Sequence, residues 1–343
     1  MQKRIAILTG GGDCPGINPV IRAIVRKAVR HNYHVIGIKN GWKGLIEKNV
    51  VSLDLGSVSG ILVKGGTILG TSRTNPFKNK EDAEIGINNF KALEIEALIA
   101  IGGEDTLGVA SKFSQQGLNI VGVPKTIDND LSGTDRTFGF DTAVNIATEA
   151  IDRIHTTAES HHRVMVVEVM GRHSGWIGLE AGLAGGADII LIPEFPIDLD
   201  EICATIKKRH ERGKTFSIVV VAEGAKFKEG TEVLQDKEKD AFGHVRLGGI
   251  GQVLCEEIQK RTWFETRVTV LGHIQRGGTP TAYDRVLGTR YGIKAMQMVL
   301  DKEFGKMASL CGTEIVSVPL EKAVGEVKTV PPELYEMAKV FFG

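Results

Sequence analysis

Acidic side chains follow two of the apolar runs in this sequence, and their residue types suit phosphate chemistry. Glu104 and Asp105 come after one run, and Asp128 and Asp130 come after the next. Carboxylates brought together repel one another unless a cation, a lysine or protonation relieves the repulsion. The grouping therefore suits Mg²⁺ held mostly through waters beside phosphates, with Lys125 as the local counter-charge. The alternative for each acid taken alone is a helix cap or a solvated loop residue.

Glycine and arginine residues add to this pattern. The segment Thr-Gly-Gly-Gly-Asp-Cys-Pro-Gly-Ile-Asn at 9–18 joins an apolar run to a helical pattern, where N–H groups and the helix dipole favour phosphate. It matches neither the P-loop nor the dinucleotide fingerprint, so a tight connection remains the alternative. Arg172, Arg267 and the segment 271–278 offer planar guanidinium groups that match phosphate oxygens. Each arginine taken singly is equally compatible with an ordinary surface position.

The elements that must position these residues are short strands alternating with helices. Continuous apolar runs are typical of parallel strands covered on both faces, and they occur at 4–9, 96–101, 120–123, 164–169, 189–192 and 216–221. Between them we expect a helix with Asn18 as its cap and Pro19 at its first position, and another from Asp141 towards Thr156. This alternation predicts a doubly wound α/β fold, in which ligands bind beyond the carboxyl ends of the strands.

Length and composition bound the remaining possibilities. A chain of 343 residues is long enough for two domains. Lys and Arg total 42 and Asp and Glu total 42, so no net charge favours nucleic acid or an anionic membrane. The cysteines lack metal-like spacing, and no signal peptide or membrane-spanning run is present, which together predict a cytoplasmic protein. The polar stretch 226–249 reads as a surface insertion.

Taken together, in this order and spacing, the segments resemble the 6-phosphofructokinase family from residue 4 to about residue 278. Within that family the chain resembles the pyrophosphate-dependent members. The resemblance implies two doubly wound, Rossmann-like domains. We expect a donor-binding domain of residues 1–139 plus about 256–303, and a sugar-phosphate domain of residues 140–255 plus about 304–343.

The resemblance also implies residue roles. Asp128, in the run Thr-Ile-Asp-Asn-Asp, would be the base that takes the proton from the 1-hydroxyl of fructose 6-phosphate, while Lys125 and Arg172 stabilise the transferring group. Asp105 would help set the donor, and Glu104 would face Mg²⁺, although many relatives have aspartate at this position. The donor-binding residues implied are Gly11, Gly12, Gly103, Asp105 and Lys125.

The sugar-phosphate site implied by the family includes residues from several segments of the chain. Arg163 and Arg267 would come from a neighbouring subunit, which makes a homodimer or homotetramer necessary. The full set is Thr126, Ile127, Asp128, Arg163, Met170, Gly171, Arg172, Glu223, Arg267, His273, Ile274, Gln275 and Arg276.

The phosphoryl donor depends mainly on Asp105. ATP-using relatives usually have glycine at this position, whereas an aspartate fills the space of the nucleotide α-phosphate and repels it. Pyrophosphate has no α-phosphate, so we expect it as the donor. An ATP-dependent phosphofructokinase is the nearest alternative. A nicotinamide dehydrogenase is disfavoured, because the sequence lacks the dinucleotide-binding fingerprint. A non-catalytic sugar-phosphate sensor is disfavoured, because it would not need Asp128.

Overall fold

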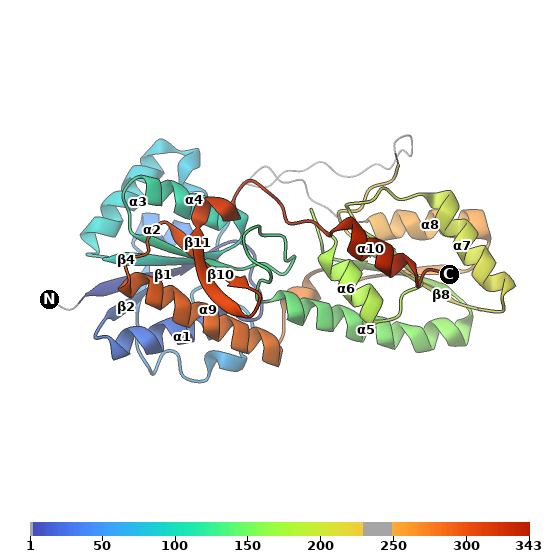
Figure 1. Ribbon diagram of the computed structural model, residues 1–343, viewed down its shortest axis with the longest axis horizontal. Coiled ribbons are helices and arrows are strands. Elements are labelled where there is room, and N and C mark those ends of the chain that lie inside the picture. Colours follow the sequence, from blue (N-terminus) through green and yellow to red (C-terminus); the bar gives the residue numbers. More distant parts are fainter. Residues whose placement is uncertain (1–2, 229–248) are drawn as a thin grey trace.

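The computed structural model describes residues 3–228 and 249–343, and within these residues the strands form two sheets. The larger sheet has the order β11-β10-β5-β4-β1-β2-β3, and the smaller has the order β7-β8-β6-β9. Each sheet forms the centre of one lobe of the elongated molecule (Figure 1). The strands are β1 Arg4–Thr9, β2 His34–Ile38, β3 Val50–Leu53, β4 Ala97–Gly102, β5 Ile120–Pro124, β6 Val164–Val169, β7 Ile189–Leu191, β8 Ser217–Ala222, β9 Thr266–Val270, β10 Lys306–Cys311 and β11 Glu314–Pro319.

Helices cover both sheets. In the larger lobe α1 packs against α9 on one side, and α3 and α4 lie on the other. In the smaller lobe α5 and α6 pack together on one side, and α7 packs against α8 on the other. The helices are α1 Ile17–Arg30, α2 Gly41–Glu47, α3 Lys80–Ala92, α4 Glu104–Gln115, α5 Phe140–His161, α6 Trp176–Ala184, α7 Leu199–Glu211, α8 Ile250–Thr262, α9 Ala282–Leu300 and α10 Pro332–Lys339.

Strand β1 shows why the apolar runs are continuous. Ile5 and Ile7 belong to the core that includes α1, whereas Ala6 and Leu8 belong to the core on the opposite face. Alternate side chains of a strand point to opposite faces, so a strand buried on both sides must be apolar throughout. The smaller sheet is parallel throughout its described strands, and the larger carries antiparallel edges at β3 and β11. The predicted doubly wound α/β fold is therefore confirmed.

The first helix begins slightly earlier in the chain than predicted. Helix α1 begins at Ile17, and its N-cap is Gly16, with φ of 112°. A Cβ at Gly16 would also lie 2.8 Å from the Phe138 ring, so glycine suits both the backbone and the space. The Asn18 side chain lies inside the first turn, where its amide donates to Lys64 O and its oxygen accepts from Ile68 N. Tertiary partners thus replace the capping role.

The predicted domain boundaries also need correction near the C-terminus. Strand β9, expected with the donor domain, pairs with β6 in the smaller sheet. Strands β10 and β11, expected with the sugar-phosphate domain, extend the larger sheet through pairing of β10 with β5. The later crossings between lobes therefore lie further along the chain than predicted, because strand pairing decides which lobe a segment joins. Most of the stretch 226–249 lies outside the described residues.

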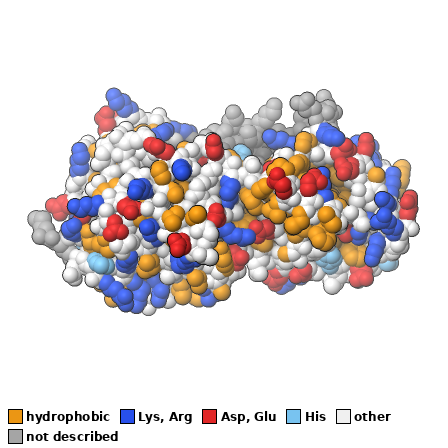
Figure 2. Space-filling view, in the orientation of Figure 1, with side chains coloured by type: hydrophobic (Ala, Val, Ile, Leu, Met, Phe, Trp, Pro, Cys, Tyr) orange, Lys and Arg blue, Asp and Glu red, His pale blue; other side chains and the backbone are white. Residues whose placement is uncertain are grey.

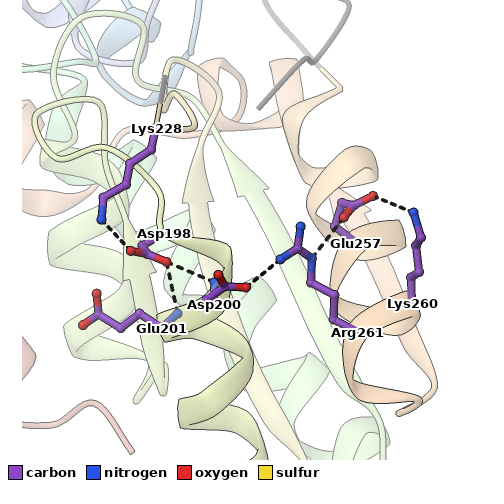
Figure 3. A network of polar contacts seen from close by, with 7 residues as sticks. All are labelled: Asp198, Asp200, Glu201, Lys228, Glu257, Lys260 and Arg261. Carbon is purple, nitrogen blue, oxygen red and sulfur yellow. Dashed lines mark hydrogen bonds and ion pairs between the residues drawn. The ribbon is translucent and has the colours of Figure 1, made fainter. Parts of the chain in front are cut away.

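Charges on the surface are mixed, and many are paired. Figure 2 shows acidic and basic side chains over both lobes, with basic ones along the lower edge where Figure 1 places α1. Figure 3 shows a paired group that joins the first turn of α7 to α8, here called the α7–α8 face; its residues are Asp198, Asp200, Glu201, Lys228, Glu257, Lys260 and Arg261. No helix in the described ranges combines the length and apolar character needed to cross a membrane.

Candidate active site

A cleft of about 160 Å³ lies at the carboxyl ends of strands from both sheets. The adjacent strands β1, β4 and β5 of the larger sheet and the adjacent strands β6 and β9 of the smaller sheet each lead into it. This is the place where doubly wound sheets bind ligands. Its lining residues are Gly11, Gly12, Arg73, Gly103, Glu104, Asp105, Thr106, Lys125, Thr126, Asp128, Asp130, Arg172, His173 and Arg276.

The N-terminus of α4 forms one wall of the cleft. Gly103 is the N-cap of this helix, and Glu104 and Asp105 occupy its first turn. Acidic residues suit this position because the helix dipole is positive at its N-terminus. Glu104 Oε1 accepts a hydrogen bond of 3.3 Å from Gly325 N, which attaches the C-terminal part of the chain to this wall. The predicted pair of acids is thus held at a helix start and faces the cleft.

Lys125 lies at the floor of the cleft, directly after β5. Its side chain is only 4% exposed, and its ammonium donates to Gly12 O of the glycine-rich loop. Burial lowers the pKa of Lys125, while Cys14, Asp13 and Asp128 oppose that shift. A buried ammonium is strongly attracted to an incoming anion, because little water competes with the ligand. The structure thus brings Lys125 into contact with Gly12, another residue expected to bind the donor.

Asp128 and Asp130 form a pair of carboxylates with raised pKa values. Burial raises the pKa of Asp128, with Glu223 adding to the shift and Arg276 and Arg172 opposing it. Burial and the neighbouring Asp128 raise the pKa of Asp130 to about 6. Within the described chain, Asp128 Oδ1 is buried and has no hydrogen-bond partner. An acceptor left unsatisfied in this way is suited to take a proton from a substrate hydroxyl.

The smaller lobe contributes guanidinium groups to the same cleft. Arg172 follows β6, and Arg276 follows β9. Arg276 Nη1 lies 3.4 Å from Asp13 O, and a Cβ at Gly12 would stand 2.6 Å from the same nitrogen. Gly12 therefore leaves the space that Arg276 occupies beside the donor loop. Together these arginines and Lys125 provide the positive charge needed for phosphate groups.

Other predicted residues lie near the cleft without lining it. Ile127 is fully buried in the core, so only its backbone could meet a ligand. Gln275 is also fully buried, and its Oε1 accepts from Met170 N at 3.3 Å, which makes it a support for the β6 end. Glu223 is close enough to Arg172 for their charges to interact, and burial raises its pKa. Three further predicted residues lie along the same strand ends, namely Gly171, His273 and Ile274.

The structure does not bring Arg163 or Arg267 to this cleft. Arg163 precedes β6, whose opposite end carries Met170, and a strand of this length spans about 20 Å. Both arginines instead pair with Glu265, at 2.8 Å for Arg163 and 2.5 Å for Arg267. They therefore form one cationic group at the far end of the smaller sheet. Their predicted role requires a second copy of the chain.

Sequence reasoning missed Arg73, Thr106 and His173 among the cleft residues. Arg73 lies in a loop that packs on the glycine-rich segment, where Gly11 N donates to Ser72 O at 3.3 Å. No apolar strand precedes this loop directly, so the pattern of strand ends did not indicate it. His173 follows Arg172, and that adjacency was the available signal. Thr106 is buried in the first turns of α4 beside the predicted acids.

The carboxylates suit a divalent cation that keeps most of its water. Glu104, Asp105, Asp128 and Asp130 all line the cleft, and oxygen donors are the preferred ligands of Mg²⁺. In residues 3–228 and 249–343 no three acidic, histidine or cysteine side chains are close enough to hold a metal directly. At such a site these carboxylates would hold the cation together with waters and phosphate oxygens.

Comparison with known proteins shows close relatives over the whole chain. The phosphofructokinase family profile matches residues 4–299. A pyrophosphate–fructose 6-phosphate 1-phosphotransferase of Amycolatopsis methanolica is 58% identical over 345 residues, covering 99% of this chain and 100% of that protein. An ATP-dependent 6-phosphofructokinase 3 of Streptomyces coelicolor is 54% identical over 337 residues, covering 98% and 99%. Phosphofructokinase from Saccharomyces cerevisiae superposes with a TM-score of 0.83 at 33% identity, over 94% of this chain and 45% of that longer chain.

The fold and the cleft define a phosphotransferase built on two doubly wound sheets. The chain belongs to the phosphofructokinase family, as the family match and the full-length relatives show. The resemblance found in the sequence is thereby confirmed.

Proposed function

We propose that this protein transfers a phosphoryl group from pyrophosphate to the 1-hydroxyl of D-fructose 6-phosphate. The products are fructose 1,6-bisphosphate and inorganic phosphate, and we expect the reaction to be reversible and to serve glycolysis in the cytoplasm. The observation that carries the proposal is Asp105 in the first turn of α4, lining one cleft with Lys125 and Asp128. The 58% identity to a pyrophosphate-dependent relative supports the same donor.

Asp128 acts as the base in this proposal. Its carboxylate accepts the proton of the sugar 1-hydroxyl as that oxygen attacks phosphorus, and the P–O bond to the departing phosphate breaks. The raised pKa of Asp128 makes it a better proton acceptor than an ordinary aspartate, provided that it is ionised at the working pH. Lys125 and Arg172 stabilise the negative charge of the transferring group, because both line the cleft beside Asp128.

The donor is held by the larger lobe. Gly11 and Gly12 of the first loop, Gly103 of the α4 N-terminus and Lys125 surround the place where phosphate would lie. Asp105 occupies the adjoining space, where its charge opposes a further phosphate. Pyrophosphate is small enough to bind without meeting that carboxylate.

The sugar phosphate is held mainly by the smaller lobe. Arg172, Met170 and Gly171 follow β6, Glu223 follows β8, and the segment from His273 to Arg276 follows β9. Glu223 would accept hydrogen bonds from sugar hydroxyls. This assignment makes the larger-sheet lobe the donor domain and the smaller-sheet lobe the sugar-phosphate domain.

A second subunit would complete the sugar-phosphate site. Arg163 and Arg267 form one group on Glu265, away from the cleft of their own chain, and arginine forks bind phosphate well. We therefore propose a homodimer or homotetramer in which these arginines reach the cleft of a neighbour. When bound, Mg²⁺ would neutralise charge on the donor phosphates, with Glu104 among the residues that hold it.

The second candidate is an ATP-dependent 6-phosphofructokinase, because an ATP-dependent relative is 54% identical over nearly the full chain. The decisive experiment compares kcat/KM for pyrophosphate and for ATP on the purified wild-type protein. Higher kcat/KM with pyrophosphate is expected. Higher kcat/KM with ATP would replace the donor assignment and leave the roles of Asp128 and the arginines unchanged.

A further inference from the structure

A segment near the C-terminus, residues 324–331 and here called the strap, crosses from one lobe to the other. It follows the turn Leu320–Ala323, which packs on α4, and leads into α10 of the smaller lobe. Figure 1 shows it as the red chain that runs between the lobes. On its way it contacts the loop that carries Asp128, in addition to connecting the two lobes.

The strap backbone is attached to residues directly after Asp128. Lys328 N donates to Asp130 O at 2.8 Å, and Leu131 forms an antiparallel bridge with Val327. Ser132 Oγ donates to Glu326 O at 2.8 Å. These contacts fix the loop from its outer side, because the strap runs beside it over successive residues.

The Lys328 side chain adds contacts to the same loop. Its Nζ lies 3.0 Å from Asn129 Oδ1, 3.0 Å from Thr134 O and 2.8 Å from Asp135 O. An ammonium has three protons, so these acceptors use all of them. The Trp176 indole donates to Lys328 O at 2.9 Å, and Lys328 Nζ lies 5.5 Å from the centre of that ring. The lysine is therefore held in one place.

Asn129 is the partner that links this lysine to the chemistry. It lies between Asp128 and Asp130, is 2% exposed, and has a φ of 53°, which is uncommon for a residue other than glycine. Its Oδ1 accepts from Thr137 N at 3.1 Å as well as from Lys328. A backbone in this region persists when surrounding contacts over-determine it.

We propose that Lys328 is a positioning residue: by holding Asn129 in its left-handed conformation, it orients the Asp128 carboxylate towards the sugar hydroxyl. The proposal rests on the proposed function, because it assigns Asp128 as the base. Lys328 does not line the cleft, so it acts through Asn129 rather than on the substrate. Burial lowers the pKa of Lys328 to about 8, and Asp135 and Asp130 oppose the shift, which keeps the side chain cationic at neutral pH.

The first test is Lys328→Met, which keeps much of the side-chain length and removes the charge and the donors. A misplaced base lowers kcat more than it weakens binding, so we expect kcat about 10- to 100-fold lower with KM for fructose 6-phosphate within about threefold. Lys328→Arg, which retains charge and donors, should recover part of kcat. Lys339→Met is the matched control, because this exposed lysine of α10 pairs with Glu336 and lies over the Tyr335 ring. Among the described residues it forms no hydrogen bond or ion pair with the Asp128 loop, so the kcat of this variant should equal that of the wild type.

A second variant keeps the test informative if Lys328→Met folds poorly. Asn129→Gly removes the side-chain acceptor, while glycine readily adopts the same positive φ. We expect Asn129→Gly to lower kcat in the same way, and the double variant to be no worse than the poorer single variant, because both changes break one link. None of these substitutions alters the hydrogen bond from Val330 N to Glu194 Oε1, so we expect the strap to stay attached to the smaller lobe.

The outcomes separate this inference from the proposed function. Wild-type protein that makes no fructose 1,6-bisphosphate with either donor would overturn the proposed function. An active wild type together with wild-type kcat in folded Lys328→Met or in Asn129→Gly would overturn the positioning role alone. Fully additive losses in the double variant would also overturn it, because independent effects cannot pass through one hydrogen bond.

Discussion

The carboxylates of the cleft and those of the α7–α8 face have opposite environments. Asp198 on that face accepts from Asp200 N, Glu201 N and Lys228 Nζ, and these hydrogen bonds lower its pKa (Figure 3). Asp128 in the cleft has a buried oxygen with no partner among the described residues, and burial raises its pKa. Hydrogen bonds within the protein thus satisfy the Asp198 carboxylate, which has a structural role. The Asp128 carboxylate keeps one oxygen without such a partner in the described part of the chain, and a bound substrate can supply it.

The two regions differ because of how their residues come together. Asp198 caps α7 through neighbours two and three residues away, and Arg261 meets Glu257 across one helical turn. The cleft acids come from the ends of separate parallel strands, which places like charges at one edge of a buried sheet. Residues a few positions apart in a helix can pair with opposite charges or with backbone N–H groups. Residues at the ends of adjacent strands are instead brought together whatever their charge, so the acids of the cleft lie close to one another.

The sharpest test of this contrast is Asp128→Asn. Loss of the base should lower kcat by about 10²–10⁴ while KM for fructose 6-phosphate stays nearly unchanged. Unfolding in urea should show equal or greater stability, because a neutral amide replaces a buried carboxylate oxygen that has no partner. Near-wild-type turnover in the purified variant would remove Asp128 from its role.

The donor side of the cleft is tested by Asp105→Gly. Removing the carboxylate relieves both the crowding and the repulsion that an α-phosphate would meet, so relative use of ATP over pyrophosphate should rise by about ten- to a hundredfold. The measurement is kcat/KM for each donor in the variant and the wild type. An unchanged ratio would show that Asp105 does not select the donor.

The arginines on Glu265 test whether a surface pair can belong to the cleft. Within one chain these arginines are ion-paired away from the cleft, as the charged residues of the α7–α8 face are. Nevertheless, Arg163→Ala and Arg267→Ala should each raise KM for fructose 6-phosphate about tenfold or more, with a smaller effect on KM for pyrophosphate. Mixing either variant with Asp128→Asn under subunit exchange should restore some activity. Hybrids that form and remain inactive would contradict a site shared between subunits.

Lowering the pH should affect the carboxylates of the cleft before it affects those of the α7–α8 face. Burial raises the pKa of Asp128 above its usual value, and the pKa of Asp130 is about 6, so both acids take up protons before an ordinary aspartate does. Activity should therefore begin to fall at a pH above 3.8, because a protonated Asp128 cannot accept the sugar proton. Asp198 has a lowered pKa, so its contribution to stability is present above 3.8 and is lost only as pH falls below that value. A pH–rate profile beside far-UV circular dichroism checks this; unfolding that accompanies the loss of activity would contradict it.

The smallest effect is expected on the α7–α8 face itself. Arg261→Ala removes exposed pairs with Asp200 and Glu257, and such pairs contribute little, so Tm should fall by no more than about 2 °C. Turnover should be that of the wild type. A large loss of activity would mean that paired surface charge and the cleft are not independent, and would break the comparison.

The sequence by itself determined the class of fold and the main candidates of the cleft. Continuous apolar runs specify parallel strands buried on both faces, and polar residues placed directly after those runs must gather at one edge of a sheet. This logic correctly predicted that Glu104, Asp105, Lys125 and Asp128 line the same cleft. The resemblance of these segments to a known family, in their order and spacing, also indicated the correct family.

Only the tertiary structure decided which distant segments share a sheet or a contact. The pairing of β10 with β5, the packing of the Arg73 loop on the glycine-rich segment and the bond from Lys328 to Asn129 join residues that no local pattern relates. The capping role expected of Asn18 failed for the same reason, since its side chain found partners near residues 64–68. Local propensity acts over a few neighbouring residues, whereas burial and hydrogen bonding are decided by the whole folded chain.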